Sequence, residues 1–274
     1  MFLHGGPGTP GEGLPEVAAD LAAAGFDVYA YDQLGAGRST RLRDVTGYTV
    51  ARQVADLEAI RVRLGADRLI LVGRSWGASL AAQYLAAHPG RVAKAVFTSP
   101  GLIWPAAWPD GGTGDPWTRA TPEQRRERDE LFSNPRILAL TVLQGIDPEA
   151  AHRLVGDDEA DELLHRFAVI GKDTGTCLGA APAPVHDNRQ GFYVNQLTVA
   201  DFATVEDPRP ALRRTRVPSL IMRGTCDFIP APVAAEYREV LPGATLVDVP
   251  AAGHAIAAEQ PEVYTRTLLT FLSE

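Results

Sequence analysis

A serine stands between two glycines in the stretch GRSWG, residues 73–77, where it could act as a nucleophile. An apolar run at residues 68–72 precedes this stretch, and an alanine-rich run at residues 76–87 follows it. A strand, then Gly-x-Ser-x-Gly, then a helix is the context of a nucleophile elbow, a sharp turn that exposes the serine hydroxyl. The flanking glycines let the strand and the helix approach each other closely. The pattern predicts Ser75 as a nucleophile, and a glycine-rich turn with an incidental serine is the alternative.

A serine hydroxyl attacks at neutral pH only with the help of a general base, and that base needs an acid to orient it. Asp227 follows an apolar run at residues 220–222, and His254 follows another at residues 245–249. Active sites of open α/β sheets form where the parallel strands end. The chain order Ser, Asp, His is the one that nucleophile-elbow hydrolases use. We therefore predict a catalytic triad of Ser75, His254 and Asp227.

Other histidines and acids have structural explanations. His88 ends a helical stretch, and Asp32 follows a strand-like run, where it can tie down a turn. Asp248 falls on a predicted strand and should point into a packed face. We expect His4 to fix a loop, since the triad already has its base. The remaining histidines fall in a segment where surface or substrate-facing roles are expected: His152, His165 and His186.

Short strand-like runs alternate with helical segments along most of the chain. This rhythm predicts an α/β fold, with a mostly parallel sheet of about six or more strands and helices on both faces. The expected strands are residues 26–31, 68–72, 93–98, 217–222 and 245–249, besides a short one ahead of the glycines at residue 5. The expected helices are residues 14–24, 50–64, 76–87, 233–241 and 262–272.

Between residues 101 and 214 the alternation fails. This segment holds three of the four tryptophans, many prolines and charged helical stretches. A long insertion between two strands of one sheet is best interpreted as a helical cap. We predict a core of residues 1–100 and 215–274 and a cap of residues 101–214. Within the cap, the Gly/Pro/Ala-rich residues 171–184 are expected to form a loop.

The composition of the chain limits the classes of partner that we expect it to bind. The 274 residues are 45% hydrophobic and 22% charged, as in ordinary globular proteins, and the net charge of −8 gives no basic patch for nucleic acid. No apolar run approaches the roughly 20 residues that span a bilayer, and the start of the chain has no secretion-signal pattern. We expect a cytoplasmic protein that acts on a small molecule or a short peptide, without nucleic-acid or membrane partners.

The sequence predicts neither a cofactor nor a metal site. It contains no nucleotide fingerprint, phosphate-binding loop or Cys/His grouping with zinc-ligand spacing. Two cysteines, Cys177 and Cys226, are too few for a disulfide framework. We expect Cys226 to be a buried small apolar residue, because no partner supports a redox role for it.

Five motifs together resemble the proline iminopeptidases, a branch of the α/β-hydrolase superfamily. They are HGGPG at 4–8, DQLGAGRS at 32–39, GRSWGASLA at 73–81, GTCDFIP at 224–230 and AGH at 252–254. The resemblance implies the same triad and an α/β-hydrolase fold. It also implies an oxyanion hole formed by the backbone N–H groups of Trp76 and of Gly6, with Gly5 as the alternative to Gly6.

The chain departs from this family in two ways. Family members usually carry two strands ahead of HGGPG, whereas this chain opens three residues before it, so either the protein dispenses with them or sequence upstream is missing. Family members also hold the substrate ammonium with glutamates from the cap. One such position falls on or near Arg189, shortly before Phe192 and Tyr193. An arginine would repel an ammonium and favour a carboxylate or a carbonyl-rich group, unless it is a surface residue.

Several functions stay open. The leading hypothesis is a serine hydrolase that cleaves an amide through an acyl-enzyme, as in proline iminopeptidase-like removal of an N-terminal aminoacyl group. An esterase, lactonase or amide hydrolase acting on a small metabolite is the alternative, and the acceptor could also be a group other than water. A non-catalytic ligand-binding protein is the rival of another class. The aromatic residues that could line an apolar pocket, or else form the core of the cap, are Trp104, Trp108, Trp117, Phe192 and Tyr193.

Overall fold

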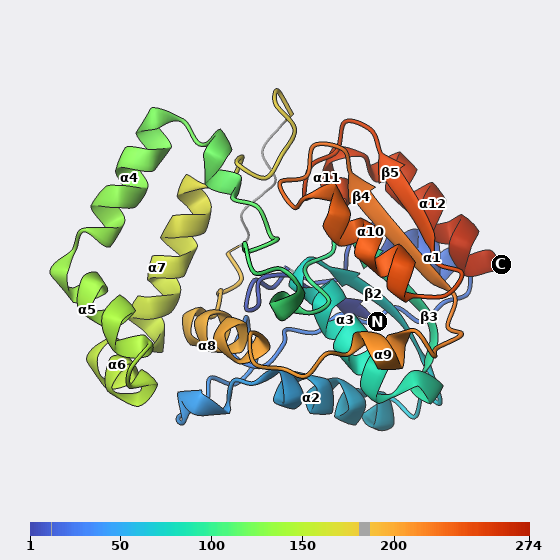
Figure 1. The fold of residues 1–274 in the computed structure, drawn as a ribbon, viewed down its shortest axis with the longest axis horizontal. Coiled ribbons are helices and arrows are strands. Elements are labelled where there is room, and N and C mark those ends of the chain that lie inside the picture. The colour runs from blue at the N-terminus through green and yellow to red at the C-terminus, as the bar shows by residue number, and fades with distance from the viewer. Residues whose placement is uncertain (12, 181–186) are drawn as a thin grey trace.

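A five-stranded parallel sheet forms the centre of the protein in a computed structural model that describes residues 1–11, 13–180 and 187–274 (Figure 1). The strands are β1 (Phe2–Leu3), β2 (Leu69–Arg74), β3 (Val92–Thr98), β4 (Ser219–Gly224) and β5 (Thr245–Val249). They lie side by side in sequence order, and each neighbouring pair is parallel. The carboxyl ends of all five strands therefore meet at one edge of the sheet.

Helices bury both faces of this sheet, because side chains alternate between the faces along each strand. Leu71, Phe97 and Ile221 belong to the hydrophobic cluster under α2, α3 and α10. Their neighbours Val72 and Val96 belong to the cluster under α1 and α12. The helices of the core are α1 (Ala18–Ala23), α2 (Val50–Arg63), α3 (Trp76–Ala87), α10 (Ala231–Val240), α11 (Ile256–Glu259) and α12 (Pro261–Ser273).

The expected strand at residues 26–31 is not formed as a strand. Ala30 makes one isolated parallel bridge with Phe2, and the Phe2 N–H donates to the carbonyl oxygen of Tyr29 at 2.8 Å. The adjoining strand β1 is only two residues long, so it offers few backbone groups for a sixth strand to pair with. The fold class is as predicted, with five strands in the described residues rather than six.

The prediction that Asp248 points into a packed face was wrong. Its side chain is 58% exposed and pairs with Arg223 at 3.0 Å. The two residues are directly opposite each other on β4 and β5, and β5 is the edge strand, which is less completely covered than the centre of the sheet.

Between β3 and β4 the described residues contain helices and loops but no strand (Figure 1). The α-helices of this segment are α4 (Pro122–Phe132), α5 (Pro135–Gln144), α6 (Pro148–Leu154), α7 (Asp157–Ile170), α8 (Phe192–Phe202) and α9 (Arg209–Leu212). Helices α4 to α7 stand to one side of the sheet, and α8 lies between them and α2. We refer to residues 101–214 as the cap. Of the loop expected at residues 171–184, residues 171–180 form turns, and residues 181–184 lie outside the described part of the chain.

The residues at which the cap helices begin are determined by the local sequence. Helices α4, α5 and α6 each begin with proline, which lacks the N–H that would be left unpaired there. In each case the preceding side chain accepts a backbone N–H of the first turn, and these capping residues are Thr121, Asn134 and Asp147. None of the helices in the described part of the chain has the length and apolar character to cross a membrane.

The turn from β2 into α3 requires glycine at residue 77. A Cβ atom there would overlap the carbonyl oxygen of Leu3 and lie 2.8 Å from that of His4. We expect Gly77→Ala to lower the free energy of unfolding by about 3 kcal/mol or more, because β1 would have to separate from α3. Gly90→Ala is the matched control, since a methyl group added at residue 90 would meet no atom within 4 Å. Denaturant unfolding of both variants is the measurement, and equal stabilities would contradict the steric explanation.

Candidate active site

Ser75 occupies the sharp turn between the end of β2 and the start of α3. Its backbone has φ 54° and ψ −120°, a conformation that residues with a side chain rarely adopt. Hydrogen bonds to the end of β3 hold it there: the Ser75 N–H donates to Thr98 O at 3.1 Å, and Ser75 O accepts from the Gly101 N–H at 3.1 Å. The geometry is that of a nucleophile elbow, as the sequence predicts.

The HGGPG loop runs directly beside this serine. A Cβ atom on Gly5 would lie 3.7 Å from Ser75 Oγ. On the other side, Trp76 is the first residue of α3, where backbone N–H groups have no partner within the helix. The HGGPG loop and the start of α3 thus both adjoin Ser75. An oxyanion hole made by Trp76 and Gly6 stays a prediction.

Asp227 and His254 are brought together from the loops that follow β4 and β5. His254 Nδ1 lies 3.0 Å from Asp227 Oδ1, and the carboxylate is 1% exposed. Burial alone would raise the pKa of Asp227, but the hydrogen bond and charge of His254, together with the Ile229 N–H at 3.0 Å, hold it below its usual range. The aspartate is therefore ionised, and it orients the imidazole so that Nε2 is left for a substrate-side partner.

The third member of the predicted triad makes no hydrogen bond to the other two among the described residues. Among the hydrogen bonds of the described residues, Ser75 Oγ makes none, and the His254 ring packs against Phe228 with centroids 4.5 Å apart. Catalytic hydrogen bonds are often long without substrate and tighten in the Michaelis complex. The structure thus brings a hydrogen-bonded Asp227–His254 pair and Ser75 to the same sheet edge, and the triad itself stays a prediction.

His4 has the loop-fixing position expected for it. Its Nε2 accepts the Gln33 N–H at 2.9 Å, and its Nδ1 lies 2.9 Å from Gly5 O, so this network assigns the proton to Nδ1. The Gln33 side chain in turn donates to His4 O and accepts the indole N–H of Trp76 at 3.0 Å. Burial lowers the pKa of His4 to about 4 and keeps the ring neutral. His4 therefore connects the HGGPG loop to the elbow helix.

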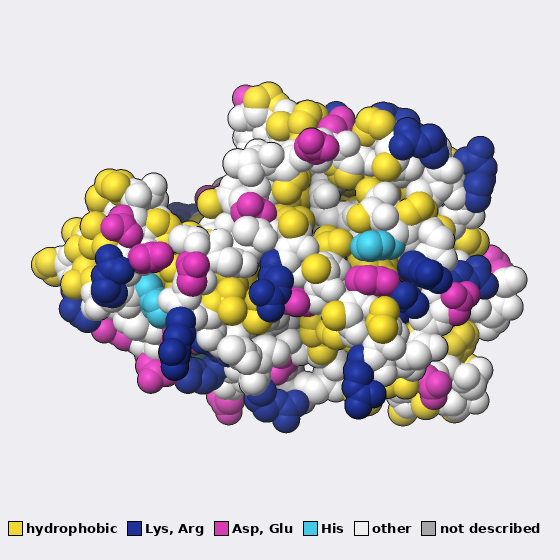
Figure 2. Space-filling view, turned by 90° about the horizontal axis from the view of Figure 1, so that it is seen from below, with side chains coloured by type: hydrophobic (Ala, Val, Ile, Leu, Met, Phe, Trp, Pro, Cys, Tyr) yellow, Lys and Arg dark blue, Asp and Glu magenta, His cyan; other side chains and the backbone are white. Residues whose placement is uncertain are grey.

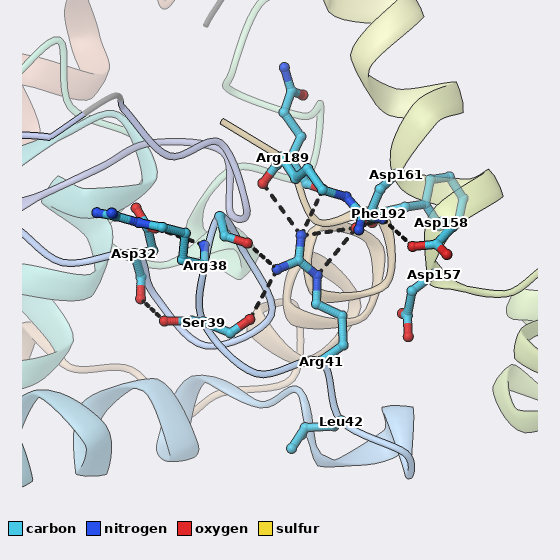
Figure 3. Close-up of polar contacts among 12 residues, drawn as sticks. Asp32, Arg38, Ser39, Arg41, Leu42, Asp157, Asp158, Asp161, Arg189 and Phe192 are labelled. Carbon is cyan, nitrogen blue, oxygen red and sulfur yellow. Dashed lines mark hydrogen bonds and ion pairs between the residues drawn. The ribbon is translucent and has the colours of Figure 1, made fainter. Parts of the chain in front are cut away.

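The other candidates weighed from the sequence occupy structural positions. Asp32 accepts the Arg38 N–H at 2.8 Å and ties down its turn, as predicted (Figure 3). His88 is the C-terminal capping residue of α3. His152 lies 3.2 Å from Asp157 in the cap. His165 lines a cavity of the cap, and His186 lies outside the described residues.

Arg189 is engaged by carboxylates of α7 (Figure 3). Its guanidinium lies 2.6 Å from Asp158 and 3.5 Å from Asp161, and Asp158 raises its pKa. Asp161 is buried and also pairs with Arg41 at 2.9 Å. A cavity of about 570 Å³ adjoins these groups and is lined by Asp158, Asp161, Glu162, His165, Asp187, Arg189 and Gln190. The charge of Arg189 is thus balanced within the protein.

The aromatic residues of the cap have structural contacts. Phe192 and Tyr193 are 6% and 2% exposed in the hydrophobic cluster of the cap, and the Tyr193 hydroxyl donates to Val155 O. The Trp104 indole donates to Val205 O, that of Trp108 donates to Glu236, and Trp117 stacks on Phe167. Phe192 and Tyr193 therefore belong to the core of the cap, and Trp117 contacts that core through Phe167. Trp104 and Trp108 instead pack against the hydrophobic cluster of the α/β core.

The expectation that Cys226 lacks a partner was wrong. Cys177 of the cap and Cys226 form a disulfide, with Cα atoms 5.2 Å apart and a sequence separation of 49 residues. Cys226 adjoins Asp227, so the bond joins the cap to the loop that carries Asp227. The spacing of two cysteines this far apart in the sequence does not predict a disulfide, because only the folded position of the cap brings them together. Glu259, which accepts the backbone N–H groups of Cys177 and Gly253, was likewise missed.

Comparisons with known proteins identify the family of the chain. Residues 1–261 match the alpha/beta hydrolase fold family, and the chain therefore belongs to it. Its sequence relatives include the proline iminopeptidase of Heyndrickxia coagulans, 27% identical over 100% of this chain and 90% of that protein. The proline iminopeptidase of Saccharolobus solfataricus is 26% identical over 100% of this chain and 84% of that protein. The resemblance to the proline iminopeptidases is thereby confirmed.

Solved structures show the same fold. An esterase from Rhodococcus sp. ECU1013 aligns with a TM-score of 0.65 and 23% identity, over 100% of this chain and 89% of that one. The proline iminopeptidase of Mycobacterium smegmatis aligns with a TM-score of 0.59 and 19% identity, over 99% of this chain and 88% of that one.

The buried His4 makes stability depend on pH in a defined window. Its folded-state pKa of about 4 lies below the ordinary 6.5, so the stability linked to the neutral ring is complete above 6.5 and is lost as the pH falls toward 4. Between pH 7 and 5 the loss is about 2 kcal/mol. In His4→Gln this contribution is absent, so urea unfolding at the two pH values should show a smaller loss than in the wild type. Equal losses would mean that His4 is solvated in the folded state.

The disulfide should stabilise the folded chain. Cys177→Ser is expected to lower the free energy of unfolding by about 2–4 kcal/mol, because the unfolded chain loses a cross-link. Adding a reductant should destabilise the wild type to a similar extent and leave the variant unchanged. A wild type that is insensitive to reductant under unfolding conditions would argue against the bond.

Proposed function

We propose that the protein is a serine hydrolase that cleaves an amide bond through an acyl-enzyme, removing an N-terminal prolyl or similar aminoacyl group. The observation that carries this proposal is the strained Ser75 turn, at the same sheet edge as a buried Asp227–His254 pair with a 3.0 Å hydrogen bond. A serine held in this conformation lowers the stability of the fold, and another residue would serve any structural task at this position better. The serine is therefore expected to have a chemical role.

Each group has a defined part in the reaction. Ser75 Oγ attacks the carbonyl carbon while His254 Nε2 takes its proton, and Asp227 stays ionised and stabilises the imidazolium. The N–H groups of Trp76 and Gly6 donate to the oxyanion of the tetrahedral intermediate, each typically contributing about 3 kcal/mol. His254 then gives the proton to the leaving nitrogen. Water repeats the sequence at the acyl-enzyme and regenerates the serine hydroxyl.

The preference for an aminoacyl group rests on the relatives and on charge in the cap. The relatives that match the whole chain are named proline iminopeptidases. Arg189 is neutralised by Asp158, so it does not repel an ammonium in the way that its sequence position suggests. The neighbouring Gly191 N–H donates to Gly8 O at 2.8 Å, which places this part of the cap against the HGGPG loop beside Ser75.

A small-metabolite ester, lactone or amide is the second candidate substrate. It is favoured by the presence of Arg189 at or near a position where the family carries an ammonium-binding glutamate. The Arg189 side chain is 53% exposed, so it could exchange Asp158 for a substrate carboxylate. Arg189→Ala separates the two: kcat/KM for a prolyl amide should change less than about threefold, whereas kcat/KM for an anionic ester would fall if the arginine binds it.

Fluorophosphonate labelling tests the catalytic assignment. The wild type should be labelled on Ser75, and Ser75→Ala should be unlabelled and lose more than about a thousandfold in kcat. An unlabelled wild type would favour the non-catalytic ligand-binding alternative, and equal labelling of Ser75→Ala would assign the reactive group to another residue and overturn the assignment. A panel of chromogenic prolyl amides and short acyl esters then distinguishes the substrate classes through their kcat/KM values.

We propose no nucleic-acid or membrane partner. On the face shown in Figure 2, basic and acidic side chains are interspersed, without the large basic patch that nucleic acid would require. A cytoplasmic location stays a prediction from the sequence. The Cys177–Cys226 disulfide is more typical of oxidising compartments, so trapping the thiol state of these cysteines in cells is the deciding measurement.

A further inference from the structure

A segment of the cap lies directly on the loop that carries the catalytic base. The His254 N–H donates to Gly175 O at 2.8 Å, so a cap residue holds the backbone of His254 itself. A Cβ atom on Gly175 would lie 3.5 Å from the Cβ of His254 and 3.6 Å from the Phe228 ring. The cap and the catalytic base are therefore in contact at this point, which we call the cap–base junction (residues 175–177 and 252–254).

One carboxylate spans this junction. Glu259 Oε1 accepts the Gly253 N–H at 2.9 Å, and Glu259 Oε2 accepts the Cys177 N–H at 2.9 Å. Glu259 ends helix α11, which begins two residues after His254. Hydrogen bonds from backbone N–H groups to a carboxylate are about twice as strong as neutral ones. Two of them on one side chain fix the distance between the cap segment and the residue that precedes His254.

The junction is too tightly packed for the two segments to shift independently. A Cβ atom on Gly253 would overlap Gly175 O and lie 2.9 Å from the Cα of Thr176 and 3.0 Å from Glu259 Oε1. Gly253 does not need glycine for its φ angle, so its role here is to let the cap backbone approach. The disulfide attaches the same cap segment, through Cys177, to the loop of Asp227.

We propose that Glu259 is a positioning residue for the catalytic histidine, acting by joining the His254 loop to the cap through its two carboxylate oxygens. This inference rests on the proposed hydrolase function. Proton transfer from Ser75 to His254 requires a precise placement of the imidazole. A misplacement of about 1 Å in an active site can cost on the order of 100-fold in rate. Glu259 controls that placement without touching the substrate.

Because the disulfide also attaches the cap segment, the positioning role of Glu259 can be tested without detaching the cap. In Glu259→Ala the Cys177–Cys226 bond still tethers the cap segment, so the fold should persist while the His254 loop loses its link to Cys177. Glu259→Gln keeps one carbonyl oxygen that can accept one of the two N–H groups, and its amide nitrogen cannot accept the other. Its effect should be intermediate. Glu262→Gln, at an exposed position three residues along, is the matched control.

The experiment compares fluorophosphonate labelling rates of the full-length wild type, Glu259→Ala, Glu259→Gln and Glu262→Gln. We expect a fall on the order of 10- to 100-fold in Glu259→Ala, a smaller fall in Glu259→Gln and wild-type rates in Glu262→Gln. With a substrate from the panel, the loss should appear in kcat, with KM changed less than about threefold. Wild-type labelling by a folded Glu259→Ala protein would overturn the proposal, as would a loss that only matches its fraction of unfolded protein.

A spectroscopic readout keeps this test independent of activity. The His254 Nδ1–H bonded to Asp227 should give a downfield proton resonance, identified by its absence in His254→Ala. We expect this resonance to shift or broaden in Glu259→Ala and to be unchanged in Glu262→Gln. An unchanged resonance in Glu259→Ala would overturn the positioning role even if no labelling occurs. If the wild type is not labelled but the resonance shifts in Glu259→Ala, only the proposed hydrolase function is refuted.

Discussion

The strained backbone of Ser75 is the constraint around which the rest of the site is organised. A side-chain-bearing residue at φ 54° is stable only where its surroundings determine its conformation. Here the end of β3 bonds the Ser75 backbone on both sides, and glycines at 73 and 77 allow β1, β2 and α3 to meet without overlap. The His4–Gln33–Trp76 hydrogen bonds then fix the adjoining HGGPG loop. These hydrogen bonds and close approaches together hold Ser75 in its conformation at the sheet edge.

The cap is tied to this framework at two places that differ in chemistry. On one side, Arg41 and Arg189 share the buried carboxylate of Asp161, and backbone bonds join the same cap segment to the loops at residues 8 and 37. On the other side, the Cys177–Cys226 disulfide and Glu259 join the cap to the loops that carry Asp227 and His254. Satisfied polar networks make a structure more rigid and fix one arrangement of the parts that they join. The position of the cap is consequently linked to the positions of the Asp227 and His254 loops.

The sequence predicted best what depends on local pattern. The strands that precede Ser75 and Asp227 and the helix at residues 76–87 were found within a few residues, because apolar periodicity and flanking glycines encode them. The strand at residues 26–31 was not formed, since its pairing depends on the length of β1, which periodicity does not report. The exposure of Asp248 depends on an edge position, and the Cys177–Cys226 bond and the Glu259 bridge depend on where the cap folds back. Such long-range contacts leave no spacing signal in a single sequence.

The central claim is that the Ser75 hydroxyl becomes a covalent nucleophile through the His254–Asp227 pair. Rapid quenching of the protein during turnover of a slowly deacylated activated ester, followed by peptide mass spectrometry, tests it most directly. We expect one acyl adduct, located on the peptide that contains Ser75 and absent when His254 is replaced by alanine. Turnover without any adduct on Ser75, or an adduct that forms equally fast without His254, would contradict it.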